Sequence, residues 1–153
     1  TFSIASARSP PISASLFEPL AQSNVNVDMI VQNTSSDGTT DISFTVPKAD
    51  MKVAESIVAD VAKQIGATGI SHDDAIAKIS LVGAGMKSSP GIAAKMFRIL
   101  ADEGVNIVMI STSTIRISVV VSSSDLERAA GALHTAFGLD SGQAYSAPLP
   151  ERK

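Results

Sequence analysis

The chain has 153 residues, of which 44% are hydrophobic and 18% charged, with a formal net charge of −3 and no cysteine. This composition supports a buried core and argues against disorder. The missing cysteines exclude disulfides, thiol nucleophiles and thiolate metal sites. The mild acidity argues against a nucleic-acid partner, because clustered Lys and Arg bind phosphate backbones. No apolar run reaches the roughly 20 residues of a membrane helix, so we expect no membrane partner. The absence of cysteine permits a cytoplasmic location, which is the one we expect.

An internal repeat with an offset of 80 residues runs through the chain. Leu16–Ile30 (LFEPLAQSNVNVDMI) and Met96–Ile110 (MFRILADEGVNIVMI) are identical at seven of fifteen positions. A match of this length predicts two copies of one unit of about 70 residues. We expect a first domain over residues 1–73, a second over residues 74–140 and a tail over residues 141–153.

Apolar spacing places the secondary structure of both copies. In the first copy the expected elements, in chain order, are a strand at Phe2–Ala5, a helix at Ile12–Gln22, strands at Val25–Asn33 and Thr40–Val46, a helix with an apolar stripe from Ala54 to Ile65, and a strand at Ala67–Ser71. The second copy repeats the order with a strand at Ala77–Val82, a helix between Pro90 and Gly104, strands at Asn106–Ser111 and Thr114–Val121, and a helix after the capping box Ser124–Glu127. No final strand is evident in Gly138–Lys153. The order predicts an α+β protein of two ferredoxin-like (βαββαβ) domains, whose antiparallel sheets carry helices on one face.

Few residues could carry catalysis. His134 lies near the end of the last predicted helix, where a solvated or capping role is the common one. The His72–Asp74 cluster lies at the domain junction, and its spacing does not place three ligands around a metal ion. The glycine-rich segment Gly83–Ser89 departs from the P-loop pattern, because Met86 stands where that pattern needs Gly. We therefore expect no catalytic residue and no metal site in this chain.

Each copy has the elements of a small anion site. A strand leads through a loop to a helix that begins near a proline, Pro10 or Pro90, and the unpaired N–H groups of a first turn favour a carboxylate. The motif V-N-[VI] after that helix adds Asn26 or Asn106, whose amide can accept from an ammonium and donate to an oxygen. These groups suit a free amino acid, and plain structural turns are the alternative interpretation.

Two segments carry a family resemblance. Lys78–Val121, with VGAGM and with ISTS followed by IRISV, closely resembles the C-terminal regulatory region of the aspartokinases, and so does Val25–Val46, which contains MIVQN. The resemblance extends from Val25 to about Leu139 and implies two ACT domains, which are ferredoxin-like modules that bind amino acids. It also implies a regulatory β subunit or an excised regulatory part. ATP and Mg²⁺ would then belong to a catalytic domain elsewhere, and no cofactor is expected here.

The resemblance further implies feedback control of aspartate phosphorylation in lysine, threonine and methionine biosynthesis. In this family L-threonine, and in some members L-lysine, binds at interfaces between the ACT domains of two chains, so a homodimer and an aspartokinase catalytic subunit or domain are the implied partners. The first implied site type combines Arg8, Pro11, Ser13 and Gln32 with Asn106 and Ile107 of the other chain. The second combines Asn26, Val27 and Asp28 with Met86, Ser89, Ala93, Ser113 and Thr114 of the other chain.

The chain departs from the family pattern at both site types. The first loop usually reads Asp-x-Pro-Gly, whereas here Arg8 reverses the charge and Pro11 removes an N–H group. At the second site type Ala93 replaces a usual Thr and Thr114 replaces a usual Glu, which weakens the case for lysine and its second ammonium. Pro19 also falls inside the first predicted helix, where proline costs ~3 kcal/mol or kinks the helix.

The leading hypothesis is an allosteric amino-acid sensor, and the alternative is a structural dimerisation module that has lost its effector. A small independent enzyme lacks an acid–base pair in this sequence. An RNA-binding version of the fold would need stacking aromatic residues on its sheet, whereas the chain has only five Phe and one Tyr.

Overall fold

The computed structural model describes residues 1–7, 12–36, 39–83, 86 and 91–141. The chain divides into two compact units, Thr1–Asp74 and Ala75–Lys153. Each unit, named unit 1 and unit 2 in chain order, has its own sheet and its own core.

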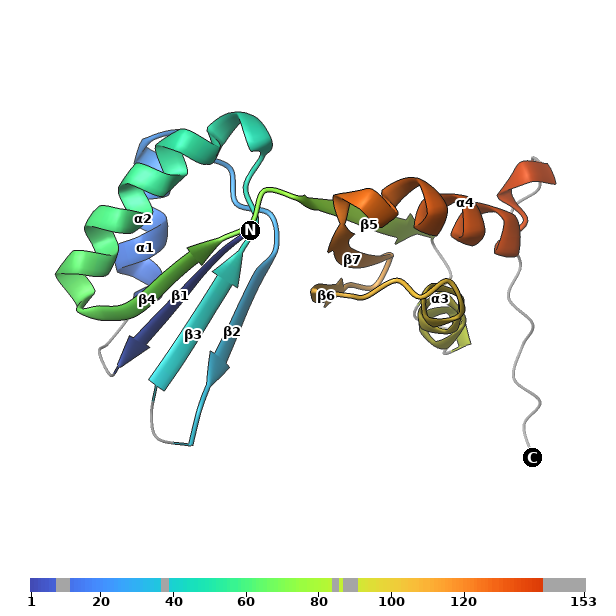
Figure 1. The fold of residues 1–153 in the computed structure, drawn as a ribbon, viewed down its shortest axis with the longest axis horizontal. Coiled ribbons are helices and arrows are strands. Elements are labelled where there is room, and N and C mark those ends of the chain that lie inside the picture. The colour runs from blue at the N-terminus through green and yellow to red at the C-terminus, as the bar shows by residue number, and fades with distance from the viewer. Residues whose placement is uncertain (8–11, 37–38, 84–85, 87–90, 142–153) are drawn as a thin grey trace. The chain divides into compact units, whose positions relative to one another are not determined.

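Unit 1 is a four-stranded antiparallel sheet with two helices on one face (Figure 1). Its elements are β1 (Phe2–Ala7), α1 (Ile12–Gln22), β2 (Ile30–Thr34), β3 (Thr39–Phe44), the 3₁₀ turn η1 (Lys48–Asp50), α2 (Met51–Ile65) and β4 (Ala67–His72). The strand order is β2-β3-β1-β4, so β2 and β4 are the edge strands. Gly66, at φ 64°, ends α2 in the left-handed conformation that glycine adopts without steric cost.

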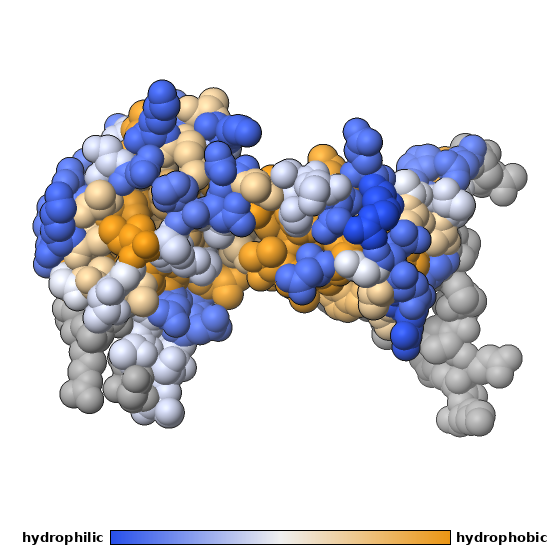
Figure 2. All heavy atoms as spheres, viewed as in Figure 1, coloured by the Kyte–Doolittle hydropathy of each residue, from blue (hydrophilic) through white to orange (hydrophobic). Residues whose placement is uncertain are grey.

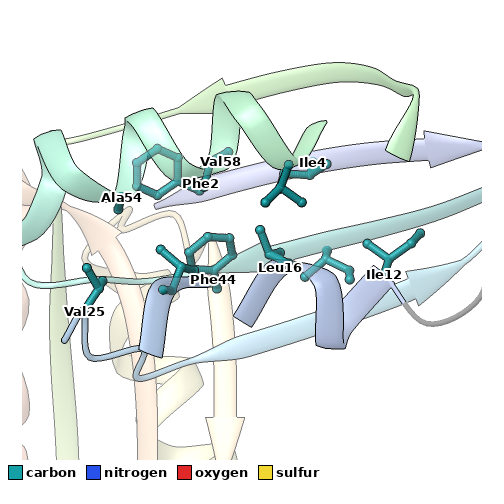
Figure 3. Packing of buried hydrophobic residues seen from close by; sticks show 11 residues of the cluster. Phe2, Ile4, Ile12, Leu16, Val25, Phe44, Ala54 and Val58 are labelled. Atoms are coloured by element: carbon teal, nitrogen blue, oxygen red, sulfur yellow. The ribbon is translucent and has the colours of Figure 1, made fainter. Parts of the chain in front are cut away.

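The core of unit 1 lies between the sheet and the helices (Figure 3). Its buried side chains alternate along the strands and recur every fourth residue along α1: Phe2, Ile4, Ile42, Phe44, Ile12, Leu16 and Leu20. The rings of Phe2 and Phe44 stack with their centroids 5.5 Å apart. Each fully buried side chain of this size contributes about 1.5–3 kcal/mol relative to exposure, so the alternating pattern fixes which face of the sheet the helices cover.

Unit 2 repeats this order of elements as far as its second helix. It contains β5 (Ile76–Val82), α3 (Gly91–Asp102), β6 (Met109–Thr112), β7 (Arg116–Ser122), the 3₁₀ turn η3 (Ser123–Asp125), α4 (Leu126–Ala136) and the 3₁₀ turn η4 (Leu139–Ser141). The described strands form an antiparallel sheet in the order β5-β7-β6. The central strand β7 packs Ile117, Val119 and Val121 against the helices. Both units therefore confirm the predicted ferredoxin-like α+β fold.

Several local expectations are corrected by the structure. The strands predicted from Val25 and Asn106 begin only at Ile30 and Met109. The capping box Ser124–Glu127 does not form, because α4 begins after Asp125, which makes no side-chain cap bond, and Ser122 caps the preceding turn instead. Helix α1 runs through Pro19 to Gln22, as its buried stripe requires.

On the face shown in Figure 2, polar side chains predominate over both units, with smaller apolar patches between them. Among the described residues, no helix is long and apolar enough to cross a bilayer.

Candidate functional site

In unit 1, the first turn of α1 meets the edge strand β2 through one polar contact. Ser13 Oγ donates a hydrogen bond of 3.3 Å to Gln32 Oε1. Ser13 is half-buried and Gln32 is exposed on the strand. With its oxygen engaged by Ser13, the Gln32 amide offers its two N–H donors to a ligand. The structure thus brings together two of the four unit 1 residues of the first site type, whereas Arg8 and Pro11 lie outside the described residues.

Between α1 and β2 an extended segment carries the unit 1 residues of the second site type. Asn26 and Asp28 are exposed, whereas Val25 and Met29 are buried and Val27 packs partly buried against the core. This alternation presents the two polar side chains on one side of the segment. We call residues 25–29 the effector segment, after the predicted contact of Asn26 and Asp28 with an effector.

Hydrogen bonds hold the effector segment at both ends. At its start, Val25 N donates to Leu20 O at 2.9 Å. At its end, Asp28 N donates to Thr45 O at 3.1 Å and Thr45 N donates to Met29 O at 3.0 Å. A further bond of 3.1 Å runs from Met29 N to Thr45 Oγ1. Thr45 is only 8% exposed, so its bonds to Asp28 and Met29 form away from bulk water.

The equivalent segment of unit 2 carries the partner residues of the first site type. Asn106 is exposed and Ile107 packs partly buried against the core of unit 2. At the start, Val105 N donates to Leu100 O at 2.8 Å, and at the end Val108 N donates to Val120 O at 2.8 Å. Asn106 is therefore held in the same local geometry as Asn26.

The remaining predicted residues lie at two places in unit 2. Ala93, half-buried, is in the first turn of α3, and Met86 packs against the core. Ser113 and Thr114 are exposed in the turn between β6 and β7, where Ser113 N donates to Arg116 O at 2.7 Å. Ser89 lies outside the described residues. How these residues meet those of unit 1 in another chain stays a prediction.

The repeat shows that the two units are chemically unequal at these positions. At an offset of 80 residues, Ser13 corresponds to Ala93 and Gln32 to Thr112. Unit 2 therefore cannot form the equivalent of the Ser13–Gln32 hydrogen bond.

Sequence reasoning did not single out Thr45, although it makes three of the bonds that hold the effector segment. A threonine in an alternating strand carries no distinctive pattern by itself. The comparison of the two copies is what draws attention to Thr45. Its equivalent in unit 2 is Val120, because Thr45 O accepts from Asp28 N as Val120 O accepts from Val108 N.

Apart from Arg8 and Asp28, the predicted site residues carry no titratable side chain. No group of three metal-ligating side chains occurs among the described residues. His134, at the end of α4, and Asp140 of η4 are exposed and hydrogen-bonded at 2.6 Å, from His134 Nδ1 to Asp140 Oδ1. Bonds from His134 and Thr135 lower the pKa of the Asp140 carboxyl below its ordinary value. In the His72–Asp74 cluster, His72 Nδ1 lies 4.0 Å from Glu55 Oε1 of α2.

Comparisons with known proteins identify the family of the two units. The family model described as "ACT domain" matches residues 6–61 and 79–137. The chain belongs to the ACT-domain family. The computed structure superposes with a TM-score of 0.83 and 36% identity on the regulatory subunit of aspartate kinase from Thermus thermophilus in its ligand-free form, covering 89% of this chain and 90% of that one. A structure of aspartokinase alpha and beta subunits gives 0.79 and 44% identity, covering 89% and 91%.

Sequence relatives place these ACT domains within the aspartokinases. The chain is 50% identical over 131 residues to an aspartate kinase of Pseudomonas fluorescens and 48% identical over 132 residues to an aspartokinase of Corynebacterium glutamicum. These matches cover 86% and 85% of this chain but only 32% and 31% of the relatives, so the chain spans about a third of their length. This ACT-domain chain is the regulatory part of an aspartokinase, as the resemblance implied.

Proposed function

We propose that this regulatory chain is a feedback sensor that binds L-threonine, with L-lysine as the second candidate, and inhibits an aspartokinase catalytic part that phosphorylates aspartate. The observation that carries the proposal is the Ser13–Gln32 pair at the first turn of α1. It places an amide beside a helix N-terminus in a chain similar to aspartokinase regulatory subunits. A cytoplasmic location belongs to the same proposal.

The first site type has groups for each part of threonine. The first turn of α1 offers backbone N–H groups and a positive dipole to the carboxylate. The Gln32 amide, with its oxygen bound to Ser13, donates to the side-chain hydroxyl. Asn106 of a second chain supplies a carbonyl oxygen for the ammonium group.

The second site type has fewer groups for lysine. Asp28 is exposed and provides a carboxylate for one ammonium. Ala93 and Thr114 contribute no second carboxylate, so the distant ammonium of lysine lacks a partner there. We therefore expect threonine to bind more tightly than lysine.

A homodimer follows from the edges of the two sheets. β2 and β6 are equivalent edge strands, and their equivalent residues Ile30 and Ile110 are 52% and 46% exposed. Exposed apolar edge strands are surfaces that pair with another strand. Pairing β2 of one chain with β6 of another would bury both side chains and bring Gln32 and Asn106 to the same interface.

Inhibition then follows from linkage. An effector that bridges two chains binds the assembled, inhibited arrangement better than any other and shifts the population toward it. The same bridging stabilises the dimer by mass action.

Calorimetric titration of the chain with L-threonine, and separately with L-lysine, tests the proposal while sedimentation follows the dimer. We expect saturable heat with threonine and a loss of that heat in Gln32→Ala. Thr112→Ala is the matched control, because Thr112 occupies the equivalent position in unit 2, and it should bind threonine as the unmodified chain does. A stable dimer that gives no heat with either amino acid would overturn the sensor and leave a structural dimerisation module.

A further inference from the structure

The structure offers an internal control for the effector segment. In both units the segment begins after a left-handed residue and a bond to the preceding helix. It ends on a bond to Thr45, which directly follows β3, or to Val120 of β7. The difference lies in the side chain of this anchoring residue. In unit 1 Thr45 adds its hydroxyl to the backbone bonds, whereas Val120 in unit 2 has no hydroxyl to add.

The fold itself does not need this hydroxyl. Threonine and valine have nearly the same shape, both residues are buried, and both accept the backbone bond of the segment, from Asp28 or from Val108. The Thr45 hydroxyl occurs in the unit whose effector segment carries a charged side chain. The unit with the exposed carboxylate of Asp28 has Thr45, and the unit with Val108 has Val120.

We infer that Thr45 is a positioning residue for the Asp28 carboxylate in the second site type. Its three bonds fix the backbone of Asp28 and Met29. An effector ammonium then meets a carboxylate whose backbone is already ordered, so binding loses less conformational entropy. This inference rests on the proposed function, in which Asp28 contacts the effector.

The comparison of the two units suggests the variants that test the role of Thr45. Thr45→Val installs the residue that unit 2 already carries at this position, so the fold accepts it. Thr45→Ser keeps the hydroxyl with one methyl group fewer. Val120→Thr adds a hydroxyl in unit 2 and is the matched control, and Asp28→Ala removes the proposed contact itself.

Effector affinity is measured by calorimetry with L-threonine and L-lysine, and thermal unfolding is recorded for every variant. For the ligand whose affinity falls in Asp28→Ala, we expect Thr45→Val to weaken binding by about tenfold. Thr45→Ser should stay within about threefold of the unmodified chain, and Val120→Thr should not change the affinity. Unchanged affinity in Thr45→Val would overturn the inference.

A double-mutant cycle separates positioning from general loss of structure. If Thr45 acts through Asp28, Thr45→Val has little further effect on affinity once Asp28 is alanine. An equal loss in the presence and in the absence of Asp28 would show that Thr45 serves only the fold, and would overturn the inference.

Amide hydrogen exchange of the unliganded chain gives a readout independent of the effector. Loss of the hydroxyl in Thr45→Val should raise the exchange rate of the Met29 amide by about tenfold. Val120→Thr, which adds a hydroxyl in unit 2, should leave that rate unchanged. If the unmodified chain bound neither amino acid, the proposed function would fail on its own. An unchanged Met29 amide in Thr45→Val would overturn the role of Thr45 in that case too.

Discussion

Asn24 and Gly104 have the same left-handed backbone conformation, with φ of 58° and 65°, at the same position after the first helix of each unit. Each donates its backbone N–H to the helix, Asn24 to Ala21 O at 3.0 Å and Gly104 to Ala101 O at 2.9 Å. This position sets the direction in which the chain enters the effector segment. Glycine adopts the conformation without steric cost, and asparagine is among the few other residues that tolerate it.

The first prediction is that Asn24→Gly raises the free energy of unfolding by up to about 1 kcal/mol, and that Asn24→Ala lowers it by about 1 kcal/mol. Urea unfolding measures both. Gly104→Ala is the control in unit 2, because a Cβ there would have no atom within 4 Å and only the backbone conformation opposes it. It should lose up to about 2 kcal/mol, more than Asn24→Ala loses, because it starts from glycine. A neutral Gly104→Ala would show that φ is not the cause.

The second prediction concerns the Ser13–Gln32 hydrogen bond. Ser13→Ala leaves the Gln32 amide without the bond that orients it, so threonine affinity should fall about fivefold. Because Gln32 is exposed, the free energy of unfolding should change by less than about 1 kcal/mol. Calorimetry and urea unfolding measure the two quantities on the same sample. Ser15→Ala, at an exposed position of the same helix, should not alter threonine affinity, and a loss there equal to that of Ser13→Ala would contradict the assignment.

The repeat and the helices could be predicted from the sequence, because both depend on local apolar spacing. Helix α1 begins at Ile12 and ends at Gln22, as its stripe of buried residues indicates. The effector segment was wrongly predicted to be part of a strand from Val25. Its apolar residues alternate as a strand's do, but its bonds to Thr45 come only at its end, so no ladder forms before Ile30. Alternating apolar residues indicate which side chains are buried, whereas a β-strand also needs hydrogen bonds to a neighbouring strand.

The candidate site was predicted less completely than the fold. The resemblance indicated Ser13 and Gln32, and the structure joins them. Thr45 was missed, because its role depends on a bond to a residue sixteen positions earlier, which no local pattern reports.

The capping box predicted at Ser124 does not form for a related reason. The preceding turn η3 satisfies the backbone there through Ser122, so the helix begins one residue later than the motif predicts.

The third prediction concerns the two separate cores. Leu20 and Leu100 are equivalent, fully buried residues of α1 and α3. Leu20→Ala and Leu100→Ala should each cost about 2–5 kcal/mol, which combines lost burial with the cavity left behind. Because Leu20 belongs to the core cluster of unit 1 and Leu100 to that of unit 2, hydrogen-exchange protection should fall in the unit that carries the substitution. An equal loss of protection in both units from either variant would contradict separate cores.

The fourth prediction is a pH dependence at the end of α4. The bonds from His134 and Thr135 to Asp140 favour the ionised carboxylate in the folded chain, so the folded-state pKa of Asp140 is lowered. A carboxyl whose pKa is lowered on folding stabilises the native state above its unfolded pKa. That stabilisation is lost as the pH falls through the folded value, which lies below the ordinary value of about 4 for aspartate.

An NMR titration of the Asp140 carboxyl carbon measures this shift directly. In the unmodified chain its midpoint should lie below that of a model peptide, and in His134→Ala it should move up toward the model value, because the largest cause of the shift is removed. Thr135→Val should move it up by less, since its bond is the smaller cause. A midpoint unchanged by His134→Ala would show that the His134–Asp140 bond does not persist in solution.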